Sequence, residues 1–597
     1  MTDQDIISPA QAQTLHGLFL ERVRRSPDKV AYRHFVHHAW HDLTWREMSL
    51  EVARWQVALS KLGLQSGDRV AIMLRNCPQW VMFDQAALSL GLVVVPLYTV
   101  DRPGNVAMML QDSGAKVLLF ESAEQWQALR TVRDQLNDIV CFISLHPLHN
   151  HDEPRLQSAQ TLLPASAQLL PYAFYKAHTL ATIIYTSGTT GKPKGVMLSH
   201  ANVLANAHAT LGAFPVRTDD VFLSFLPLSH TLERTLGYYL TLMAGAEVAF
   251  ARSIPQLPED LQVIRPTLLI SVPRVYERIL TSINHKLASS NSVSRALFKL
   301  TVAIGWAHFE HQQGRSTWQM RLLLWHVLDR LVAQKVLQRL GGNLRAAFSG
   351  GAPLPPDIAR VLIGLGLPIV QGYGLTETSP VITANRLDHN LPNTVGKPIQ
   401  DVQVRLDPQN VLWVKGANVM QGYWQNPEAT RAVLDADGWL NTGDIASLSH
   451  TGHIQITGRV KEIIVMSNGE KISPSDMEMA ISHDPLFEQV MIYGEGQPYL
   501  IAIVVLNLAT WQHFAHEIGV RPDMVEAFTD SRVQGKVLKR ISLSLNNFPS
   551  YAHIRRVLLL QEAWSIENGF LTPTLKLKRE VVMQRYAAQI QKLYERY

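Results

Sequence analysis

The sequence is poor in cysteine: its 597 residues include only Cys77 and Cys141, and both stand beside apolar residues. This count fits buried thiols in a reducing compartment better than a disulfide framework. The chain also lacks Gly/Ser tracts, blocks of like charge and fixed-period repeats, so we expect neither disorder nor a solenoid. Its first residues do not form a basic segment followed by an apolar one. We therefore expect no secretory signal and a cytoplasmic location.

Long apolar runs and a strong excess of one charge are absent as well. The most apolar window, residues 86–100, is too short to span a bilayer and contains Pro96. Lys and Arg number 55 against 50 Asp and Glu, and the basic residues occur along the whole chain. We predict no transmembrane segment and no nucleic-acid partner.

The chain is longer than the roughly 250 to 300 residues that one hydrophobic core usually supports, so several lobes are expected. Strand-like runs alternate with helical stretches in the order of a doubly wound parallel sheet. These runs lie at residues 69–74, 116–120, 221–226, 268–272, 344–348 and 367–370. Shorter alternating segments after Gly396 predict a barrel-like antiparallel lobe. The pattern changes again past Gly458, which places a domain boundary at 459–461.

A loop rich in glycine and hydroxyl groups, residues 185–195, is suited to hold a polyphosphate. Its glycines let backbone N–H groups turn towards an anion, and its side chains supply hydrogen bonds and positive charge. Apolar runs at 180–185 and 196–198 predict that it joins two strands as a hairpin. Pro193 follows Gly191 and Lys192, which excludes a Walker loop; an ordinary surface turn remains the alternative. The candidate ligands are Thr186, Ser187, Gly188, Thr189, Thr190, Gly191, Lys192 and Lys194.

Three later segments carry further candidate residues for a nucleotide. Gly350, Gly351 and Ala352 follow a predicted strand, where small residues let a flat base approach the backbone. Residues 371–378 place an aromatic, a hydroxyl and a carboxylate close together, and residues 438–459 supply an acid and an arginine. Taken singly, these acids and the arginine are also typical of solvated loops and surface ion pairs. The candidates in these two segments are Tyr373, Gly374, Thr376, Glu377, Asp444 and Arg459.

Together with residues 571–579, these motifs resemble the adenylate-forming superfamily of acyl-CoA synthetases, peptide-synthetase adenylation domains and luciferases. The resemblance covers nearly the whole chain, and the motifs occur in the same order. It implies that Lys576 bridges the substrate carboxylate and phosphate, although Leu575 replaces the usual glycine and Lys578 offers a competing assignment. Residues 226–234, 272–277 and 468–474, and the extra length between 279 and 344, look most like long-chain fatty acyl-CoA synthetases.

The resemblance also implies an architecture. We expect an α/β fold whose large N-terminal domain, residues 1–458, contains two doubly wound, mainly parallel sheets and a β-barrel-like lobe. A hinge at 459–461 would join it to a small, mobile α+β C-terminal domain, residues 462–597. Whether the protein is a monomer or a homodimer stays open.

The resemblance further implies a two-step reaction in which ATP converts a fatty acid to an acyl adenylate and coenzyme A then takes the acyl group. By the same resemblance Tyr373 stacks on adenine, Thr376 touches the α-phosphate, and Asp444 and Arg459 hold the ribose. Mg²⁺ would bind Glu377, because magnesium favours oxygen ligands beside substrate phosphates.

The second step would use residues of the hinge and of the C-terminal domain. Lys461 occupies the hinge position, and Gly469 and Lys471 lie on the segment expected to enter for thioester formation. His230 would gate the acyl site or orient the carboxylate; a satisfied structural histidine is the alternative. The rival functions are a fatty acyl-AMP ligase, a carrier-protein-directed synthetase, a ligase for another hydrophobic carboxylate, and a catalytically silent binding protein.

Residues 318–340 mix large apolar and basic side chains. They predict a basic amphipathic helix that packs against the core or, alternatively, contacts the inner face of a membrane peripherally. The apolar members are Trp318, Leu322, Leu323, Trp325, Leu328, Leu331 and Leu337, and the basic ones are Arg321, Arg330, Lys335 and Arg339.

Overall fold

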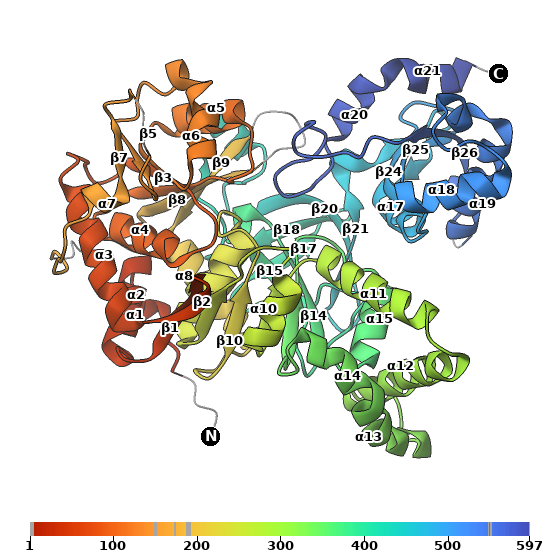
Figure 1. Cartoon of the computed structure of the whole chain (residues 1–597), viewed down its shortest axis with the longest axis horizontal. Coiled ribbons are helices and arrows are strands. Elements are labelled where there is room, and N and C mark those ends of the chain that lie inside the picture. Colours follow the sequence, from red (N-terminus) through yellow and green to blue (C-terminus); the bar gives the residue numbers. More distant parts are fainter. Residues whose placement is uncertain are drawn as a thin grey trace.

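The computed structural model describes residues 5–148, 152–171, 175–186, 193–546, 548–549 and 552–595. The first sheet of the N-terminal part has the strand order β16-β15-β14-β13-β12-β10-β11-β1-β2. Figure 1 labels β1, β2, β10, β14 and β15 of this sheet. Strands β14, β13, β12, β10, β11 and β1 run parallel, and β2, β15 and β16 add antiparallel edges. The bounds are β1 (Val30–Val36), β2 (Ala39–Thr44), β10 (Val221–Ser224), β11 (Glu247–Phe250), β12 (Leu268–Ser271), β13 (Ala346–Ser349), β14 (Ile369–Gly374), β15 (Val381–Ala384) and β16 (Lys397–Pro398).

The second sheet has the order β19-β9-β8-β4-β3-β5-β6-β7. Its strands from β8 to β7 are parallel, whereas β9 pairs antiparallel with β8, with Ile184 opposite Val196. The predicted hairpin around the glycine-rich loop is therefore confirmed in its two strands. The bounds are β3 (Arg69–Met73), β4 (Val93–Pro96), β5 (Ala115–Phe120), β6 (Cys141–Ser144), β7 (Leu156–Ser158), β8 (Leu180–Thr186), β9 (Lys194–Ser199) and β19 (Gly422–Tyr423).

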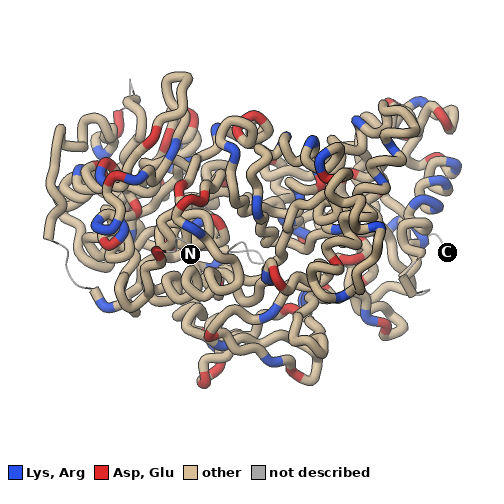
Figure 2. The backbone as a smooth tube through the Cα atoms, turned by 90° about the horizontal axis from the view of Figure 1, so that it is seen from below, with Lys and Arg blue, Asp and Glu red and all other residues tan. Residues whose placement is uncertain are grey.

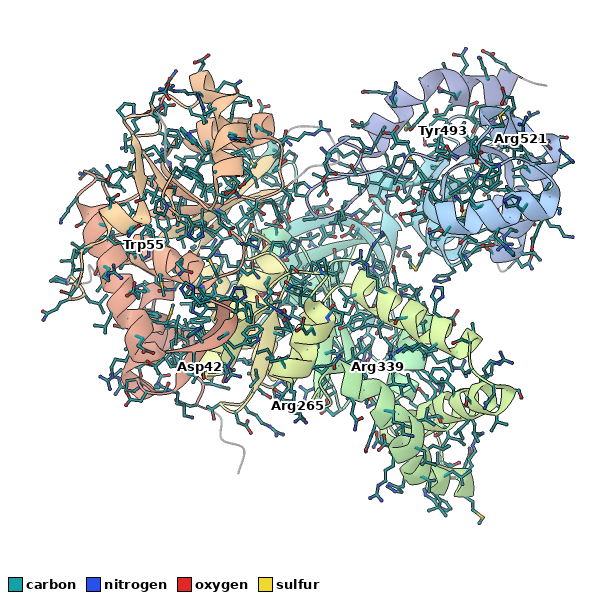
Figure 3. The ribbon with its side chains drawn as sticks, in the orientation of Figure 1. Asp42, Trp55, Arg265, Arg339, Tyr493 and Arg521 are labelled. Atoms are coloured by element: carbon teal, nitrogen blue, oxygen red, sulfur yellow. The ribbon has the colours of Figure 1, made fainter. Side chains whose placement is uncertain are left out.

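Helices cover the sheets, and one apolar core extends over side chains from both. Helix α3 starts where Thr44 and Glu47 form a reciprocal capping box, and Trp55 on its inner face meets Phe83 edge-on at 5.3 Å between ring centroids (Figure 3). The bounds are α1 (Pro9–Ala12), α2 (Leu15–Arg25), α3 (Trp45–Ser60), α4 (Pro78–Ser89), α5 (Pro103–Ser113), α6 (Ala123–Arg130), η1 (Arg133–Gln135), α7 (Ala159–Leu162), α8 (His200–Ala213), η2 (Glu233–Tyr239), α9 (Leu240–Ala244), α10 (Leu257–Ile264) and α15 (Pro356–Gly364).

A helical lobe is inserted between β12 and β13. It consists of α11 (Pro273–Ala288), α12 (Ser292–Gln312), η3 (Met320–Leu324), α13 (Trp325–Leu328), η4 (Asp329–Ala333), α14 (Gln334–Leu337) and η5 (Gln338–Leu340). Residues 320–340 are thus helical as predicted, but 3-10, α and π turns alternate within them. No helix in the described ranges is long and apolar enough to cross a membrane.

The third lobe is the antiparallel sheet β17-β18-β20-β21. Register pairing places Asp444 of β20 opposite Arg459 of β21, so two motifs separated in sequence meet across this sheet. The bounds are η6 (Thr376–Thr378), β17 (Gln403–Leu406), β18 (Val411–Lys415), α16 (Pro427–Arg431), β20 (Leu440–Leu448) and β21 (Ile454–Arg459).

The C-terminal part has its own sheet, β24-β25-β26, and its own apolar clusters on the two faces of that sheet. Together with the three N-terminal sheets, this confirms the predicted fold class; hinge motion stays a prediction. Figure 2 shows basic and acidic residues interspersed over both parts. The bounds are η7 (Val460–Glu462), β22 (Ile464–Val465), β23 (Lys471–Ile472), α17 (Pro474–Ser482), β24 (Phe487–Tyr493), β25 (Leu500–Leu506), α18 (Leu508–Ile518), η8 (Val525–Thr529), α19 (Ser531–Ser544), β26 (Ile554–Leu560), α20 (Arg579–Arg585) and α21 (Ala587–Glu595).

Candidate active site

The two ends of the glycine-rich loop are held by the β8–β9 pair. Thr186 ends β8 opposite Lys194, the first residue of β9, and its hydroxyl lies 3.5 Å from the Lys194 carbonyl oxygen. The Lys194 ammonium lies 5.0 Å from the ring centroid of Tyr423. The remaining predicted loop ligands lie outside the described residues: Ser187, Gly188, Thr189, Thr190, Gly191 and Lys192.

Tyr423 links this loop to the predicted magnesium ligand. Its hydroxyl donates a hydrogen bond of 2.8 Å to Oε1 of Glu377, which lies in η6 directly after Thr376. Burial raises the pKa of Tyr423, and the Glu377 charge raises it further, so the phenol stays protonated and remains a donor. The sequence motifs do not identify Tyr423 as a site residue. The pattern that could have indicated it is the aromatic pair after Gly422, whose strand pairs with β9.

Tyr373, Asp444 and Arg459 form a second connected group. The Tyr373 hydroxyl donates to Oδ2 of Asp444, and Nε of Arg459 donates to Oδ1 at 2.6 Å. Asp444 is only 2 % exposed. Burial disfavours the charge of Arg459, but the adjacent carboxylate outweighs burial and raises the pKa of the guanidinium. An aromatic face and an ion pair thus stand side by side, as recognition of a nucleoside requires.

Lys576 reaches this cluster from the C-terminal part. Its segment is fixed locally, because its amide N–H donates to the Thr572 hydroxyl at 3.0 Å and its carbonyl oxygen accepts from the Thr572 amide at 2.9 Å. Leu575, which stands where the resembling enzymes carry glycine, has a φ of 61°, in the left-handed region that glycine favours. Leucine therefore keeps the backbone shape of the motif at some conformational strain.

The surroundings of Lys576 depress its pKa. Lys576 is exposed, and partial loss of hydration near the surrounding protein is the largest cause of its lowered pKa; repulsion from Arg459 adds to it. The opposing attractions come from Asp444, Glu377 and Glu462. The ammonium therefore lies within electrostatic reach of both groups described above.

His230 lies within electrostatic reach of Lys576, and its predicted role at the acyl site stays a prediction. Burial lowers the pKa of His230 to about 4, and the Lys576 charge contributes in the same direction. The amide of Leu232 donates to Nδ1 of His230 at 3.2 Å, so the neutral ring carries its hydrogen on Nε2. A neutral imidazole that donates through its Nε2–H is suited to hydrogen bonding with a carboxylate.

The glycine motifs divide into two kinds. Gly350 is buried, and a Cβ added there would lie 3.4 Å from the Leu232 side chain, so this motif borders the His230 segment. Gly351 has a φ of 81° and is exposed, as is Ala352. At Gly374, close packing requires glycine, because a Cβ there would lie 1.8 Å from the Pro380 carbonyl oxygen.

Several predicted residues lie apart from the cluster. Lys461 is exposed in η7, and Gly469 and Lys471 lie on the exposed β22–β23 hairpin. No hydrogen bond or ion pair within the described ranges joins Lys471 to the cluster. Lys578, the competing lysine, is the residue before α20. Asp444 and Glu377 attract the Lys576 ammonium, and the assignment of Lys576 over Lys578 as the adenylation lysine stays a prediction.

The donor set fits a magnesium ion shared with a substrate. No group of three or more His, Cys, Asp or Glu residues in the described part of the chain could hold a metal. Tyr423 engages Oε1 of Glu377, which leaves Oε2 to bind a cation. Because Mg²⁺ keeps several waters and takes oxygens from phosphates, one carboxylate oxygen suffices.

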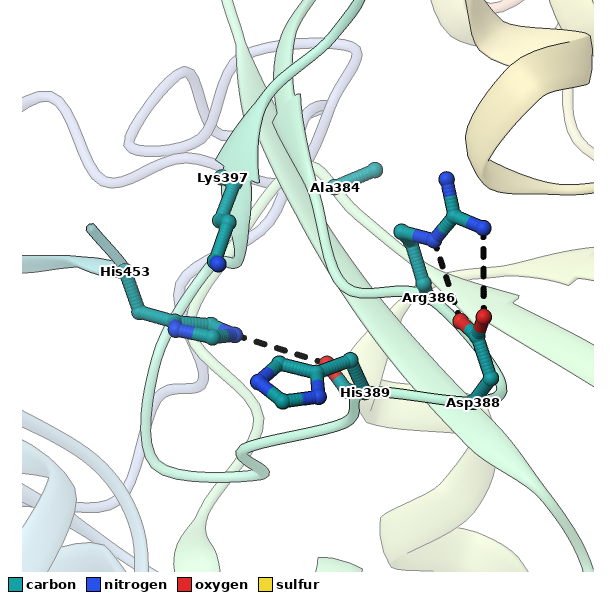
Figure 4. A pocket seen from close by; sticks show the side chains of 6 residues that line it. All are labelled: Ala384, Arg386, Asp388, His389, Lys397 and His453. Atoms are coloured by element: carbon teal, nitrogen blue, oxygen red, sulfur yellow. Dashed lines mark hydrogen bonds and ion pairs between the residues drawn. The ribbon is translucent and has the colours of Figure 1, made fainter. Parts of the chain in front are cut away.

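A separate cavity of about 260 Å³ opens beside the antiparallel lobe (Figure 4). His453, which precedes β21, has Nε2 3.4 Å from the His389 carbonyl oxygen, and Arg386 pairs with Asp388. None of the predicted site residues lines this cavity. The lining residues are Ala384, Arg386, Asp388, His389, Lys397 and His453.

Residues 19–424 match the model of the AMP-binding enzyme family, and residues 461–597 match that of the AMP-binding enzyme C-terminal domain. The chain belongs to the AMP-binding enzyme family. The resemblance to adenylate-forming enzymes is thereby confirmed. This chain is 30 % identical over 594 residues to the long-chain-fatty-acid–CoA ligase FadD15 of Mycobacterium bovis, with 97 % of each chain covered.

Two further matches bear on function and fold. The long-chain-fatty-acid–[acyl-carrier-protein] ligase AEE15 of Arabidopsis thaliana, a chloroplast protein, is 27 % identical over 637 residues, covering 96 % of this chain and 86 % of that relative. The solved anthranilate CoA ligase AuaEII, in complex with anthranoyl-AMP, superposes with a TM-score of 0.73. The two sequences are 18 % identical, and the superposition covers 97 % of this chain and 98 % of the solved chain. This likeness supports the fold alone.

Proposed function

We propose that the protein is an ATP-dependent long-chain fatty acid:CoA ligase that works through an acyl adenylate and releases AMP and pyrophosphate. One observation carries the proposal. Lys576, from the last thirty residues of the chain, lies within electrostatic reach of Glu377, Asp444 and Arg459 and of the neutral His230. A cation between a nucleoside-binding pair and a carboxylate-orienting imidazole supports the joining of a carboxylate to a phosphate.

In the first step a carboxylate oxygen attacks the α-phosphorus of ATP, and the bond to the pyrophosphate oxygen breaks. Tyr373 stacks on adenine, Asp444 and Arg459 hold the ribose hydroxyls, and Thr376 contacts the α-phosphate. Lys194 and the loop before it hold the β- and γ-phosphates. A magnesium ion on Glu377 would neutralise phosphate charge when bound.

Two further side chains act on the reacting carboxylate. The Lys576 ammonium offsets the repulsion between carboxylate and phosphate, and the Nε2–H of His230 orients the carboxylate for attack. No protein nucleophile is required, because the acyl group passes directly to the nucleotide.

In the second step the thiol sulfur of coenzyme A attacks the acyl carbonyl carbon, the bond to the AMP oxygen breaks, and the thiol proton is released. Lysine at 576 has no role in this step. We propose that the C-terminal domain turns about Lys461 and brings Gly469 and Lys471 to the acyl carbonyl. The exposed position of the β22–β23 hairpin supports such a rearrangement.

The substrate assignment follows the ligase activity in the name of the FadD15 relative. A long acyl chain offers on the order of 0.8 kcal/mol of burial for each methylene, so no charged specificity residue is needed. A carrier-protein-directed synthetase is the second candidate, favoured by the name of the AEE15 relative. We place the enzyme in the cytoplasm, with peripheral contact to the inner face of the membrane.

The test is incubation with ATP, Mg²⁺ and carboxylates of increasing chain length, with and without coenzyme A. We expect AMP, pyrophosphate and acyl-CoA in equal amounts, with the highest kcat/KM for long chains. The Lys578→Ala variant should react normally and the Lys576→Ala variant should not form adenylate. Adenylate as the sole product in the presence of coenzyme A would refute the ligase and support the second candidate.

A further inference from the structure

The segment 318–340 carries two apolar stripes, and the fold buries only one of them. Leu322, Leu328 and Ala333 are buried, and Ala333 packs with Phe298 of α12 and Leu365 after α15. This inner stripe attaches the segment to the rest of the helical lobe. Of the seven apolar residues behind the core-packing interpretation, two are buried, two are partly buried against apolar clusters and three are exposed. The buried ones are Leu322 and Leu328, the partly buried ones Trp325 and Leu337, and the exposed ones Trp318, Leu323 and Leu331.

The outer stripe faces solvent. Met320, Leu323, Leu324, Val327 and Leu331 follow one another within twelve residues, across consecutive 3-10, α and π turns, and all five are exposed. Met320 is 76 % exposed and Leu323 is 59 % exposed, and the other three are about half exposed. Trp318, which precedes them, is 55 % exposed. Exposed apolar residues gathered in one short segment indicate an interaction surface, whereas scattered ones do not.

The same lobe holds the charge excess of the chain. Residues 281–340 contain eight Lys and Arg against two acids, whereas the remaining residues contain 47 against 48. Both acids are engaged, Glu310 with Arg315 and Asp329 with the Gln334 amide. All eight basic residues are exposed. They are Lys286, Arg295, Lys299, Arg315, Arg321, Arg330, Lys335 and Arg339, the last labelled in Figure 3.

We propose that this lobe is a docking surface for the headgroup region of an anionic lipid bilayer, with the outer stripe inserted between headgroups and the basic residues on lipid phosphates. An apolar stripe beside basic side chains fits such a boundary, which is apolar within and anionic at its surface. A nucleic acid would not cover the apolar stripe. A second copy would place one strongly basic lobe against another, so mutual repulsion opposes a symmetric dimer here.

The lobe also has a direct connection to the candidate site. Helix α11 begins beside the candidate site. A side-chain carbon of Val272 lies 3.7 Å from where a Cβ on Gly351 would be, and the Tyr276 hydroxyl donates to the Phe348 carbonyl oxygen at 3.5 Å. From there α11 extends about 24 Å towards α12. Docking would thus place a membrane-borne carboxylic acid near the site, a consequence that rests on the proposed function. Bilayer binding itself does not depend on the proposed function.

The test is co-sedimentation of the full chain with vesicles, without ATP or substrate. The vesicles are phosphatidylcholine alone or phosphatidylcholine with a third of phosphatidylglycerol. We expect binding to the anionic vesicles that weakens with salt. Two variants test the surface: Leu323→Ser with Val327→Ser and Leu331→Ser, and Arg321→Gln with Arg330→Gln. Each should weaken binding, the second by roughly 30-fold at low salt.

A matched control removes three exposed apolar residues elsewhere: Leu50→Ser, Val263→Ser and Leu543→Ser. It should bind like the wild type, and all variants should keep the far-ultraviolet circular dichroism of the parent. Absent binding of the wild type, equal loss in the control, or equal binding to uncharged vesicles would each overturn the proposal. So would a concentration-dependent dimer in light scattering that the serine variant abolishes.

Discussion

At the residue scale, the pH dependence of adenylation follows from two shifted pKa values. In the proposed reaction Lys576 acts only when protonated, and its pKa is lowered from the ordinary value of 10.5. Activity is therefore present at lower pH and lost as pH rises through that lowered value. His230, with a pKa of about 4, is already neutral at pH 5.5 and adds no transition near 6.5. Single-turnover pyrophosphate release between pH 5.5 and 10 should show a basic limb and no histidine limb.

Two substitutions separate these contributions. Lys576→Arg should keep part of the activity and move the basic limb upward, because guanidinium does not titrate in this range. His230→Gln should lower the rate without changing the shape of the profile. An acidic limb near 6.5 that disappears in His230→Gln would show that the imidazole titrates during catalysis, against this expectation.

At the element scale, the π-helical turn η2 contains a buried carboxyl group. Glu233 is 1 % exposed, its Oε2 has no hydrogen-bond partner, and Gly237 leaves space for Oε1. Burial raises the pKa of Glu233 to about 8, although a hydrogen bond from Ser224 opposes the shift. The folded state therefore binds a proton that the unfolded chain releases above about 4.5. This contribution to stability is complete at acid pH and is lost as pH rises towards 8.

Glu233→Gln should remove this dependence, since the amide stays neutral and can keep the bond to Ser224. We expect the variant to be more stable than the wild type by about 1 to 3 kcal/mol above pH 8, and close to it at pH 5. Thermal unfolding at both pH values measures the difference. Glu580→Gln, at an exposed position, is the control and should change neither. If both proteins lose stability equally between pH 5 and 8, then Glu233 is charged in the fold.

Sequence patterns predict the elements well where one face is buried, and poorly where contacts are distant. Strands β8 and β9 follow from the apolar runs at 180–185 and 196–198, and the Thr44–Glu47 cap marks the start of helix α3; both are local signals. The two stripes of 318–340 are both visible in the sequence, but only packing against α12 decides which one is buried. Tyr423 escapes prediction because its partner Glu377 lies 46 residues away, and periodicity carries no information on such a pair.

At the scale of the whole molecule, a hydrogen bond joins the N-terminal domain to the segment of the C-terminal domain that precedes Lys576. Arg102, just before α5, donates through Nη2 to the Glu567 carbonyl oxygen at 2.7 Å, and Gly569 provides the space for its guanidinium. Glu567 and Gly569 lie on the segment that leads to Lys576. This single bond therefore favours the domain arrangement that presents Lys576, and the proposed second step requires the contact to open.

Arg102→Ala should consequently slow adenylation and spare thioester formation. The loss of one solvent-exposed hydrogen bond is worth about 1 kcal/mol, which corresponds to a roughly fivefold lower population of the arrangement shown here. Pyrophosphate release in a single turnover should fall by up to that factor, while acyl-CoA formation from supplied acyl adenylate should hold or rise. Arg46→Ala, which removes an exposed ion pair with Asp28, should leave both rates unchanged. An equal decrease in the two half-reactions would mean that Arg102 supports folding and not the balance between domain arrangements.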